Sequence, residues 1–162
     1  MSLHIIATGG TFDKHYDPIT GQLVFADSAL PEALARARIT DPARFESLMG
    51  IDSLDMNDTH RTQILSVCER SDEQKIVIIH GTDTMRETAQ VLGQAGLQKT
   101  IVLTGAMVPY RVASSDALFN LGFAIAVAQL NAPGVFVAMN GRVFSWDRVR
   151  KNKTDGIFEN AD

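Results

Sequence analysis

Residues 75–92, KIVIIHGTDTMRETAQVL, join a strand pattern directly to a helix pattern. Residues 76–79 are apolar and mostly β-branched, and the run is too short for a helix, which predicts a strand buried on both faces of a parallel sheet. Thr84 and Glu87 have the spacing of a helix capping box, so a helix is expected next. Thr82 and Asp83 then lie between the carboxyl end of a strand and the amino end of a helix. There they can hold a polar substrate, or they can simply cap the helix.

The rest of the chain alternates in the same way. Residues 12–30 form a long polar connection of the kind found in functional lids or disordered segments, and residues 147–162 are polar and expected to be irregular. The pattern predicts further strands at residues 3–7, 45–51, 100–103 and 134–138, a hairpin strand at 142–144, and helices at 31–38, 59–69, 85–94 and 114–130.

This alternation predicts an α/β fold: a doubly wound, mostly parallel sheet with helices on both faces and right-handed crossovers. We expect the flavodoxin-like strand order 2-1-3-4-5, followed by the C-terminal hairpin strand. In that order the third strand lies beside the first, and ligands bind in the crevice between them. The turns at residues 8–11 (TGGT) and 80–84 (HGTDT) would then face each other across that crevice.

Composition narrows the class of protein. A chain of 162 residues with 45% hydrophobic and 21% charged residues is predicted to form a single globular domain, residues 1–162. Its net charge of −4 argues against a general nucleic-acid binder. Cys68, the only cysteine, excludes an internal disulfide and is expected to be a buried apolar residue. No signal peptide is evident and no apolar run approaches the roughly 20 residues of a membrane span, so a cytoplasmic protein without membrane association is expected.

Several common motifs are absent from the sequence. It has no G-x-G-x-x-G fingerprint, no Walker A lysine and no G-x-S-x-G elbow. The four histidines, at positions 4, 15, 60 and 80, are too scattered for a zinc site, and His80 is expected to support its turn. What remains is threonine chemistry, in which a hydroxyl becomes a nucleophile only beside a base or a polarising group such as a lysine.

Several segments together resemble the bacterial-type L-asparaginase and glutaminase family. The two signature segments are residues 7–11 (ATGGT) and 80–85 (HGTDTM). The resemblance continues, in the family's order, through residues 55–58 (DMND), 105–107 (GAM) with Pro109, and 119–121 (FNL). It therefore covers nearly the whole chain.

The resemblance implies an L-asparagine amidohydrolase that needs neither a metal nor another cofactor. Thr11 would attack the side-chain amide and form an acyl-enzyme, with Tyr16 on a closing lid helping to deprotonate or orient it. Lys151 and Asp83 would polarise Thr82 or a water molecule. The expected catalytic residues are Thr11, Tyr16, Thr82, Asp83 and Lys151, and the expected substrate-binding residues are Gly10, Ser53, Gly81, Thr82, Asp83 and Ala106, the last through its carbonyl.

Some of these assignments have competitors. Tyr110 is a second tyrosine near a turn, and Lys153 shares a basic run with Lys151 that could be a solvated face. Leu54 stands where many members of the family carry a glutamine that contacts substrate, and a leucine cannot make that hydrogen bond. The alternatives are an amidohydrolase that prefers glutamine or another amide, and a catalytically weak binding or assembly subunit.

Members of the family also carry a second, smaller α/β domain that supplies an acidic residue to a neighbouring subunit's site. This sequence stops about where that domain would begin, as expected for either a short form or a truncated one. The missing acid would bind the substrate's α-ammonium, so weaker substrate binding is expected more than lost chemistry. The resemblance further implies a homo-oligomer, a dimer or a tetramer.

Overall fold

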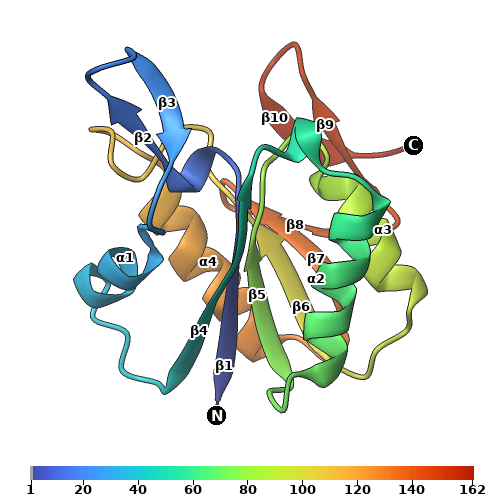
Figure 1. Ribbon diagram of the computed structural model, residues 1–162. Helices are drawn as coiled ribbons and strands as arrows, with labels where there is room; N and C mark the ends of the chain where they lie inside the picture. Colours follow the sequence, from blue (N-terminus) through green and yellow to red (C-terminus); the bar gives the residue numbers. More distant parts are fainter. Residues whose placement is uncertain (1) are drawn as a thin grey trace.

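A computed structural model describes residues 2–162 of the chain (Figure 1). Its strands are β1 (Leu3–Gly9), β2 (Lys14–Asp17), β3 (Gln22–Phe25), β4 (Ala43–Ile51), β5 (Lys75–Ile79), β6 (Thr100–Thr104), β7 (Gly134–Met139), β8 (Arg142–Ser145), β9 (Val149–Asn152) and β10 (Ile157–Asn160). Its helices are α1 (Leu30–Arg36), α2 (Asp58–Arg70), α3 (Met85–Gln94) and α4 (Ala117–Leu130), with single 3₁₀ turns η1 (Thr11–Asp13) and η2 (Ser53–Asp55).

The central sheet has six strands in the order β4-β1-β5-β6-β7-β8. β1 pairs in parallel with both β4 and β5, β6 continues the parallel array to β7, and β8 returns antiparallel to β7. Numbered by first appearance, the five parallel strands run 2-1-3-4-5, so the expected order and the added hairpin strand are confirmed. β1 and β5 therefore lie side by side at the switch point.

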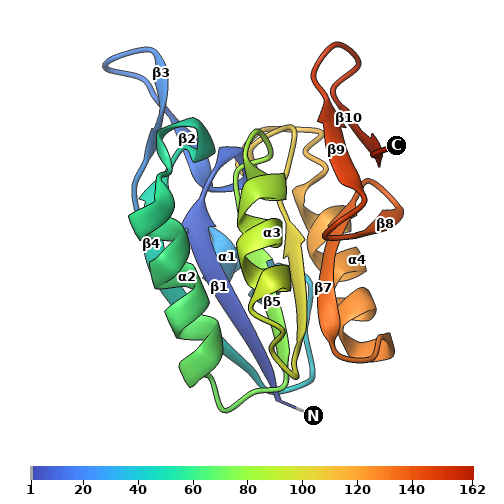
Figure 2. The ribbon, with the colours of Figure 1, turned by 90° about the vertical axis from the view of Figure 1, so that its right-hand side faces the viewer.

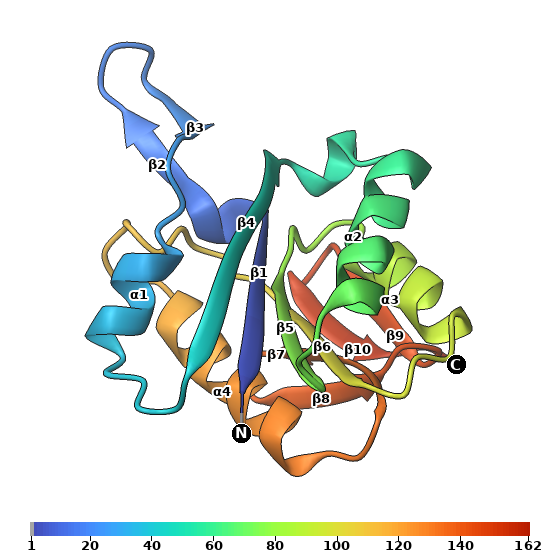
Figure 3. The same ribbon diagram turned by 60° about the horizontal axis from the view of Figure 1, so that its bottom comes forward.

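Helices cover both faces of this sheet (Figures 2 and 3). Side chains on α1 and α4 pack into one buried cluster and those on α2 and α3 into the other. Strand β5 shows why its residues are apolar without alternation: Val77 and Ile79 enter the first cluster, while Ile76 and Ile78 enter the second. A strand buried on both faces needs hydrophobic side chains at every position.

Two hairpins rise at the end of the sheet where the parallel strands terminate, one on each side (Figure 1). The first, β2–β3, lies within residues 12–30, which the sequence pattern describes only as a polar connection. Its strands are four residues long and largely exposed, so they lack the apolar alternation that marks a strand.

The second hairpin, β9–β10, corrects the expectation that residues 147–162 are irregular. Val149 and Phe158 are buried and dock the hairpin onto the α2/α3 side of the molecule. Gly156, at φ +66°, closes the turn between the two strands. With only one buried side chain on each short strand, the pattern is too weak to read from sequence.

The capping-box expectation at the start of α3 is wrong. The hydroxyl of Thr84 makes no cap; instead its Oγ1 donates to the carbonyl of Ser53, 2.7 Å away. The chain does contain a capping box, at α2, where Asn57 and His60 exchange side-chain and backbone hydrogen bonds. Thr84 stands at the N-cap position of α3, but its side chain holds two loops together and does not cap the helix.

Two further expectations concern the single cysteine and membrane-spanning helices. Cys68 is fully buried on α2, and burial raises the pKa of its thiol to about 12, so it behaves as an apolar core residue. Across residues 2–162, no helix is both long enough and apolar enough to cross a membrane.

Candidate active site

The turns after β1 and β5 touch at two glycines. A Cβ added to Gly10 would lie 2.4 Å from the Gly81 nitrogen, which is a separation that real side chains do not reach. Gly10 also has φ +73°, a conformation that favours glycine. The two residues that follow these glycines, Thr11 and Thr82, are therefore brought to neighbouring loops by direct backbone packing.

Thr11 is the first residue of η1 and is half-buried. Thr82 is buried, at 6% exposure. Both follow the carboxyl end of a parallel strand, where the strands of an open α/β sheet leave room for a ligand. The structure thus places the two threonines of the TGGT and HGTDT segments at one edge of the sheet.

Lys151 lies beside the second threonine. Its Nζ is 2.8 Å from Thr82 Oγ1 and 2.8 Å from Asp83 Oδ1. The lysine side chain is 13% exposed and the aspartate 31%, so the ion pair is shielded on the lysine side and open on the other. β9 delivers this lysine from a position 68 residues further along the chain than Asp83. Lys153, its competitor, is exposed in the turn of the same hairpin.

Ser53 packs against the same turn. It is 1% exposed, and a Cβ on Gly81 would lie 2.6 Å from its Oγ. The Ser53 hydroxyl also accepts a hydrogen bond from the backbone N–H of Thr84, at 3.3 Å. Ser53 therefore packs directly against the turn that carries Thr82 and Asp83.

The loop after β6 also packs against the Thr82 turn. A Cβ on Gly105 would lie 2.4 Å from the His80 carbonyl oxygen and 3.5 Å from the methyl carbon of Thr82. Ala106 follows and is 1% exposed. The expected substrate-binding residues thus lie on three adjoining loops around one turn.

The two tyrosines take different positions. Tyr16 lies on β2 and is 60% exposed, and it lines a cavity of about 490 Å³ with His15, Asp27, Arg111 and Ala26. That cavity is lined by neither of the two threonines, nor by Asp83 or Lys151.

Tyr110 is 7% exposed, and its ring stacks on Phe12. Its hydroxyl donates to Glu32 on α1 at 3.3 Å, so it is directed to a helix and away from the threonines. Of the two tyrosines, only Tyr16 lies on an exposed hairpin.

The ion pair between Lys14 and Asp52 was not predicted from the sequence. Lys14 Nζ on β2 lies 2.7 Å from Asp52 Oδ2, which joins the Tyr16 hairpin to the Ser53 turn. The hydrogen bond from Lys14 is the main reason that the pKa of Asp52 lies below its usual range. Lys14 also lies over the Phe25 ring on β3, 5.5 Å from its centroid. Nothing in the spacing of residues 14 and 52 marks this pair, because only the fold brings them together.

His80 supports the turn from within the core, as expected. Its Nδ1 lies 2.7 Å from the Gly81 carbonyl, which can only accept, so Nδ1 carries the proton. Its Nε2 then accepts from Thr88 Oγ1, 2.8 Å away, and Thr88 in turn accepts from Arg61 Nε at 3.2 Å. Complete burial lowers the pKa of His80 to about 4, so the ring is neutral near pH 7.

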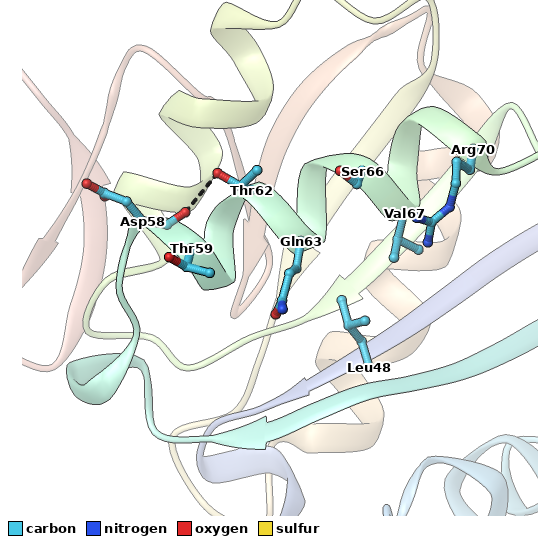
Figure 4. A pocket seen from close by; sticks show the side chains of 8 residues that line it. All are labelled: Leu48, Asp58, Thr59, Thr62, Gln63, Ser66, Val67 and Arg70. Carbon is cyan, nitrogen blue, oxygen red and sulfur yellow. Dashed lines mark hydrogen bonds between the residues drawn. The ribbon is translucent and has the colours of Figure 1, made fainter.

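Neither a metal cluster nor a large cavity defines the site. Among residues 2–162, no three His, Cys, Asp or Glu side chains are grouped to hold a metal ion. A cavity of about 560 Å³ lies elsewhere, between β4 and α2, where its polar lining includes Thr62 and Gln63 (Figure 4). It shares no residue with the loops around Thr82.

Chemically, the loops at this edge of the sheet and the Lys151 side chain carry two hydroxyls, an ammonium and a carboxylate. Within residues 2–162, the backbone N–H groups of Thr82 and Asp83 donate to no protein acceptor. They lie just before the amino end of α3, whose dipole favours negative charge. Such a set can bind a small zwitterion and can stabilise the oxyanion of an acyl-transfer reaction.

Comparison with known proteins agrees with this arrangement. The family model described as "Asparaginase, N-terminal" matches residues 2–159. "L-asparaginase 2" of Escherichia coli (strain K12) is 35% identical over 168 residues, which cover 96% of this chain and 48% of that protein. A subunit of the glutamyl-tRNA(Gln) amidotransferase of Thermococcus kodakarensis is 37% identical over 147 residues, covering 86% of this chain and 33% of that protein.

Solved structures give the same result. The thermostable L-asparaginase from Thermococcus kodakarensis superposes with a TM-score of 0.84 at 29% identity, over 99% of this chain and 51% of that one. The chain spans about half the length of the L-asparaginases that it matches. With a family model covering nearly all of its residues and relatives above 30% identity, this chain belongs to the asparaginase family.

Proposed function

We propose that this protein is an amidohydrolase that converts L-asparagine to L-aspartate and ammonia through an acyl-enzyme on Thr11. The observation that carries the proposal is the Lys151 ammonium, which donates hydrogen bonds at 2.8 Å to both Thr82 and Asp83. A lysine held between a hydroxyl and a carboxylate can move a proton to or from that hydroxyl.

In the first half-reaction, Thr11 Oγ attacks the carbonyl carbon of the side-chain amide. The hydroxyl proton passes to a neighbouring base, with Tyr16 in the role of the group that orients or deprotonates Thr11. The carbon–nitrogen bond then breaks, the nitrogen takes up a proton, and ammonia leaves. An ester between Thr11 and the aspartyl group remains.

In the second half-reaction, water attacks this ester and releases aspartate. Lys151 and Asp83 polarise Thr82, or a water beside it, to supply the proton transfers. The free N–H groups at Thr82 and Asp83 stabilise the oxyanion that forms in both steps, a contribution of about 10²–10³ in rate for one such donor.

Substrate binding uses the three loops around the Thr82 turn. Ser53 and Asp83 hold the α-carboxylate and α-ammonium groups, and the backbones at Gly10 and Gly81 allow close approach. The Ala106 carbonyl accepts a hydrogen bond from the amide nitrogen that will leave.

A second candidate is an amidohydrolase for another side-chain amide, above all glutamine. One relative favours it directly: the "Glutaminase-asparaginase" of Acinetobacter glutaminasificans is 31% identical over 160 residues. The amidotransferase relative, named for glutamyl-tRNA(Gln), also widens the range of amides to test. Leu54, 64% exposed beside Ser53, cannot donate a hydrogen bond to either substrate.

Ammonia release tests both candidates. The 162-residue chain is assayed with L-asparagine, L-glutamine and an N-substituted asparagine, each at high concentration so that weak substrate binding does not hide turnover. Ammonia mainly from asparagine supports the first candidate, and ammonia mainly from glutamine supports the second. Calorimetric binding of asparagine and aspartate without any turnover would support the binding or assembly subunit instead.

The expected homo-oligomer stays a prediction. Light scattering coupled to size-exclusion chromatography measures the mass directly: a dimer or tetramer of the 17.7 kDa chain would support the expectation, and a monomer at the assay concentration would oppose it.

A further inference from the structure

Asp116 precedes α4 and accepts hydrogen bonds from four different residues. The Met107 backbone N–H lies 3.0 Å from each of its two oxygens, and the Val108 N–H lies 3.0 Å from Oδ1. The side-chain amides of Asn120 and Asn140 lie 3.0 and 2.9 Å from Oδ2. Asp116 makes no side-chain cap for its own helix, so its carboxylate serves the loop after β6.

Two neighbouring side chains fix the same loop on both sides of Ala106. Ser115 Oγ donates to the Val108 carbonyl at 2.7 Å, and Asn120 Nδ2 donates to the Gly105 carbonyl at 2.9 Å. The residues before and after Ala106 are thus held from the amino end of α4. Within residues 2–162, the Ala106 carbonyl itself accepts no hydrogen bond.

The surroundings of Asp116 require a charged acceptor. All four of its partners are N–H donors, so an amide in place of the carboxylate would set its NH₂ group against other donors. Burial alone would raise the pKa of Asp116, but the hydrogen bonds from Asn140, Met107 and Val108 outweigh it and lower the pKa. The carboxylate is therefore ionised across the neutral pH range.

We infer that Asp116 is a positioning residue that sets the Ala106 carbonyl to receive the leaving amide nitrogen. The inference rests on the proposed function, because it needs a substrate whose amide reaches Ala106. Aspartate, the product, has no amide N–H to donate to that carbonyl. Loss of the positioning should therefore slow turnover of asparagine and leave the affinity for aspartate unchanged.

The principal test compares Asp116→Asn with the wild type and with Asp147→Asn. Asp147 is a matched control, because its exposed carboxylate accepts from Ser145 within its own turn and accepts no hydrogen bond from the loop after β6 among residues 2–162. We expect Asp116→Asn to lower kcat for asparagine by about 10–100-fold, the size of effect that a displacement near 1 Å can produce, with aspartate affinity within twofold of wild type. Asp147→Asn should change neither. An unaltered kcat in Asp116→Asn, or an equal fall in aspartate affinity, would overturn the inference.

A gentler variant covers the case in which Asp116→Asn does not fold. Asn140→Gly removes one of the four donors, and glycine tolerates the φ of +48° at that turn. It should lower kcat in the same direction but by less, again without changing aspartate affinity. A kcat equal to the wild-type value would oppose the inference.

Amide hydrogen exchange separates this inference from the proposed function. If Asp116 holds the loop, Asp116→Asn or Asn140→Gly should speed exchange at Met107 and Val108 by about tenfold or more while β5 and β6 keep their protection. Exchange at the wild-type rate would refute the positioning role whatever the activity. If wild type releases no ammonia from any amide but this exchange effect is present, the proposed function fails, and the loop anchor is retained.

Discussion

Lys151 Nζ and Thr82 Oγ1 lie 2.8 Å apart, although 69 residues separate them along the chain. The contact exists because β9, a strand of a small C-terminal hairpin, docks against the end of the sheet at which β5 terminates. A lysine on an exposed hairpin would be an ordinary solvated cation. Here its side chain is 13% exposed and donates hydrogen bonds to both the Asp83 carboxylate and the buried Thr82 hydroxyl, which makes it a candidate for proton transfer.

The first prediction compares the two lysines of this hairpin. Lys151→Met should lower kcat for ammonia release by about 10²–10⁴-fold, because it removes a group proposed for acid–base work. Lys153→Met, in the exposed turn of the same hairpin, should leave kcat within about twofold. Equal effects of the two substitutions would show that the hairpin's charge matters and the position of Lys151 does not.

The second prediction concerns the close approach of the two glycine turns. Gly10→Ala should destabilise the fold by about 1–3 kcal/mol and lower kcat, because its Cβ would meet the Gly81 backbone in a conformation that favours glycine. Gly96→Ala is the control: it also has positive φ, +64°, but its Cβ would have nothing within 4 Å. In urea unfolding, the control should lose about 1 kcal/mol of unfolding free energy. In the ammonia-release assay, it should keep the wild-type activity. Equal losses of stability and of activity in Gly10→Ala and Gly96→Ala would contradict a special role for the contact between Gly10 and Gly81.

The third prediction is a pH dependence of stability from His80. Its pKa lies near 4 in the folded state and near 6.5 when unfolded, so between these values the unfolded chain binds the extra proton. Stability should therefore fall as pH drops from about 6.5 to 4, by about 3 kcal/mol from this group.

Urea unfolding at pH 7 and pH 4.5 measures that change. His80→Asn keeps a donor for the Gly81 carbonyl but cannot titrate, so the pH dependence should shrink. A remainder is expected, because burial also lowers the pKa of His4. The same pH dependence in wild type and His80→Asn would count against a neutral His80.

The fourth prediction concerns the salt bridge that ties the Tyr16 hairpin to the Ser53 turn. The pKa of Asp52 is lowered, so its contribution to stability is present above the unfolded pKa of about 4 and is lost as pH falls below it. Lys14→Met should cost about 0.5–1 kcal/mol at pH 7 and less at pH 3, in urea unfolding at both pH values. It should also raise KM for asparagine, because the hairpin loses an anchor. A cost that is independent of pH would argue against the ion pair.

How far the sequence predicts the fold depends on how much each element is buried. β5, with a continuous apolar run over residues 76–79, and α3, Met85–Gln94, lie where their patterns predict. The strand order follows the same logic, because buried parallel strands with helical crossovers permit few arrangements. The two hairpins at the end of the sheet with the candidate site were missed, since their strands are short and carry few buried side chains.

Some residues of the candidate site can be placed from the sequence and others cannot. Thr11 and Thr82 can be placed from sequence, because both follow strong strands and the strand order sets those strands together. The Lys14–Asp52 pair and the Asp116 cluster could not, since each joins segments whose spacing carries no periodic signal. The Lys151 contact with Thr82 was expected through the family resemblance alone, because no periodic pattern marks it. The capping-box spacing at Thr84 misled for a related reason: the hydroxyl is bound by the distant Ser53 carbonyl.

The proposed mechanism is tested most directly by the rate of ammonia release from L-asparagine by wild type, Thr11→Ala and Thr11→Ser. We predict that wild type releases ammonia, that Thr11→Ala shows no release above background, and that Thr11→Ser, which keeps a hydroxyl, retains part of the activity. Aspartate binding and unfolding free energy should stay near wild type in Thr11→Ala, which separates lost chemistry from a lost fold. Substantial ammonia release by a folded Thr11→Ala would contradict the assignment of Thr11 as the nucleophile.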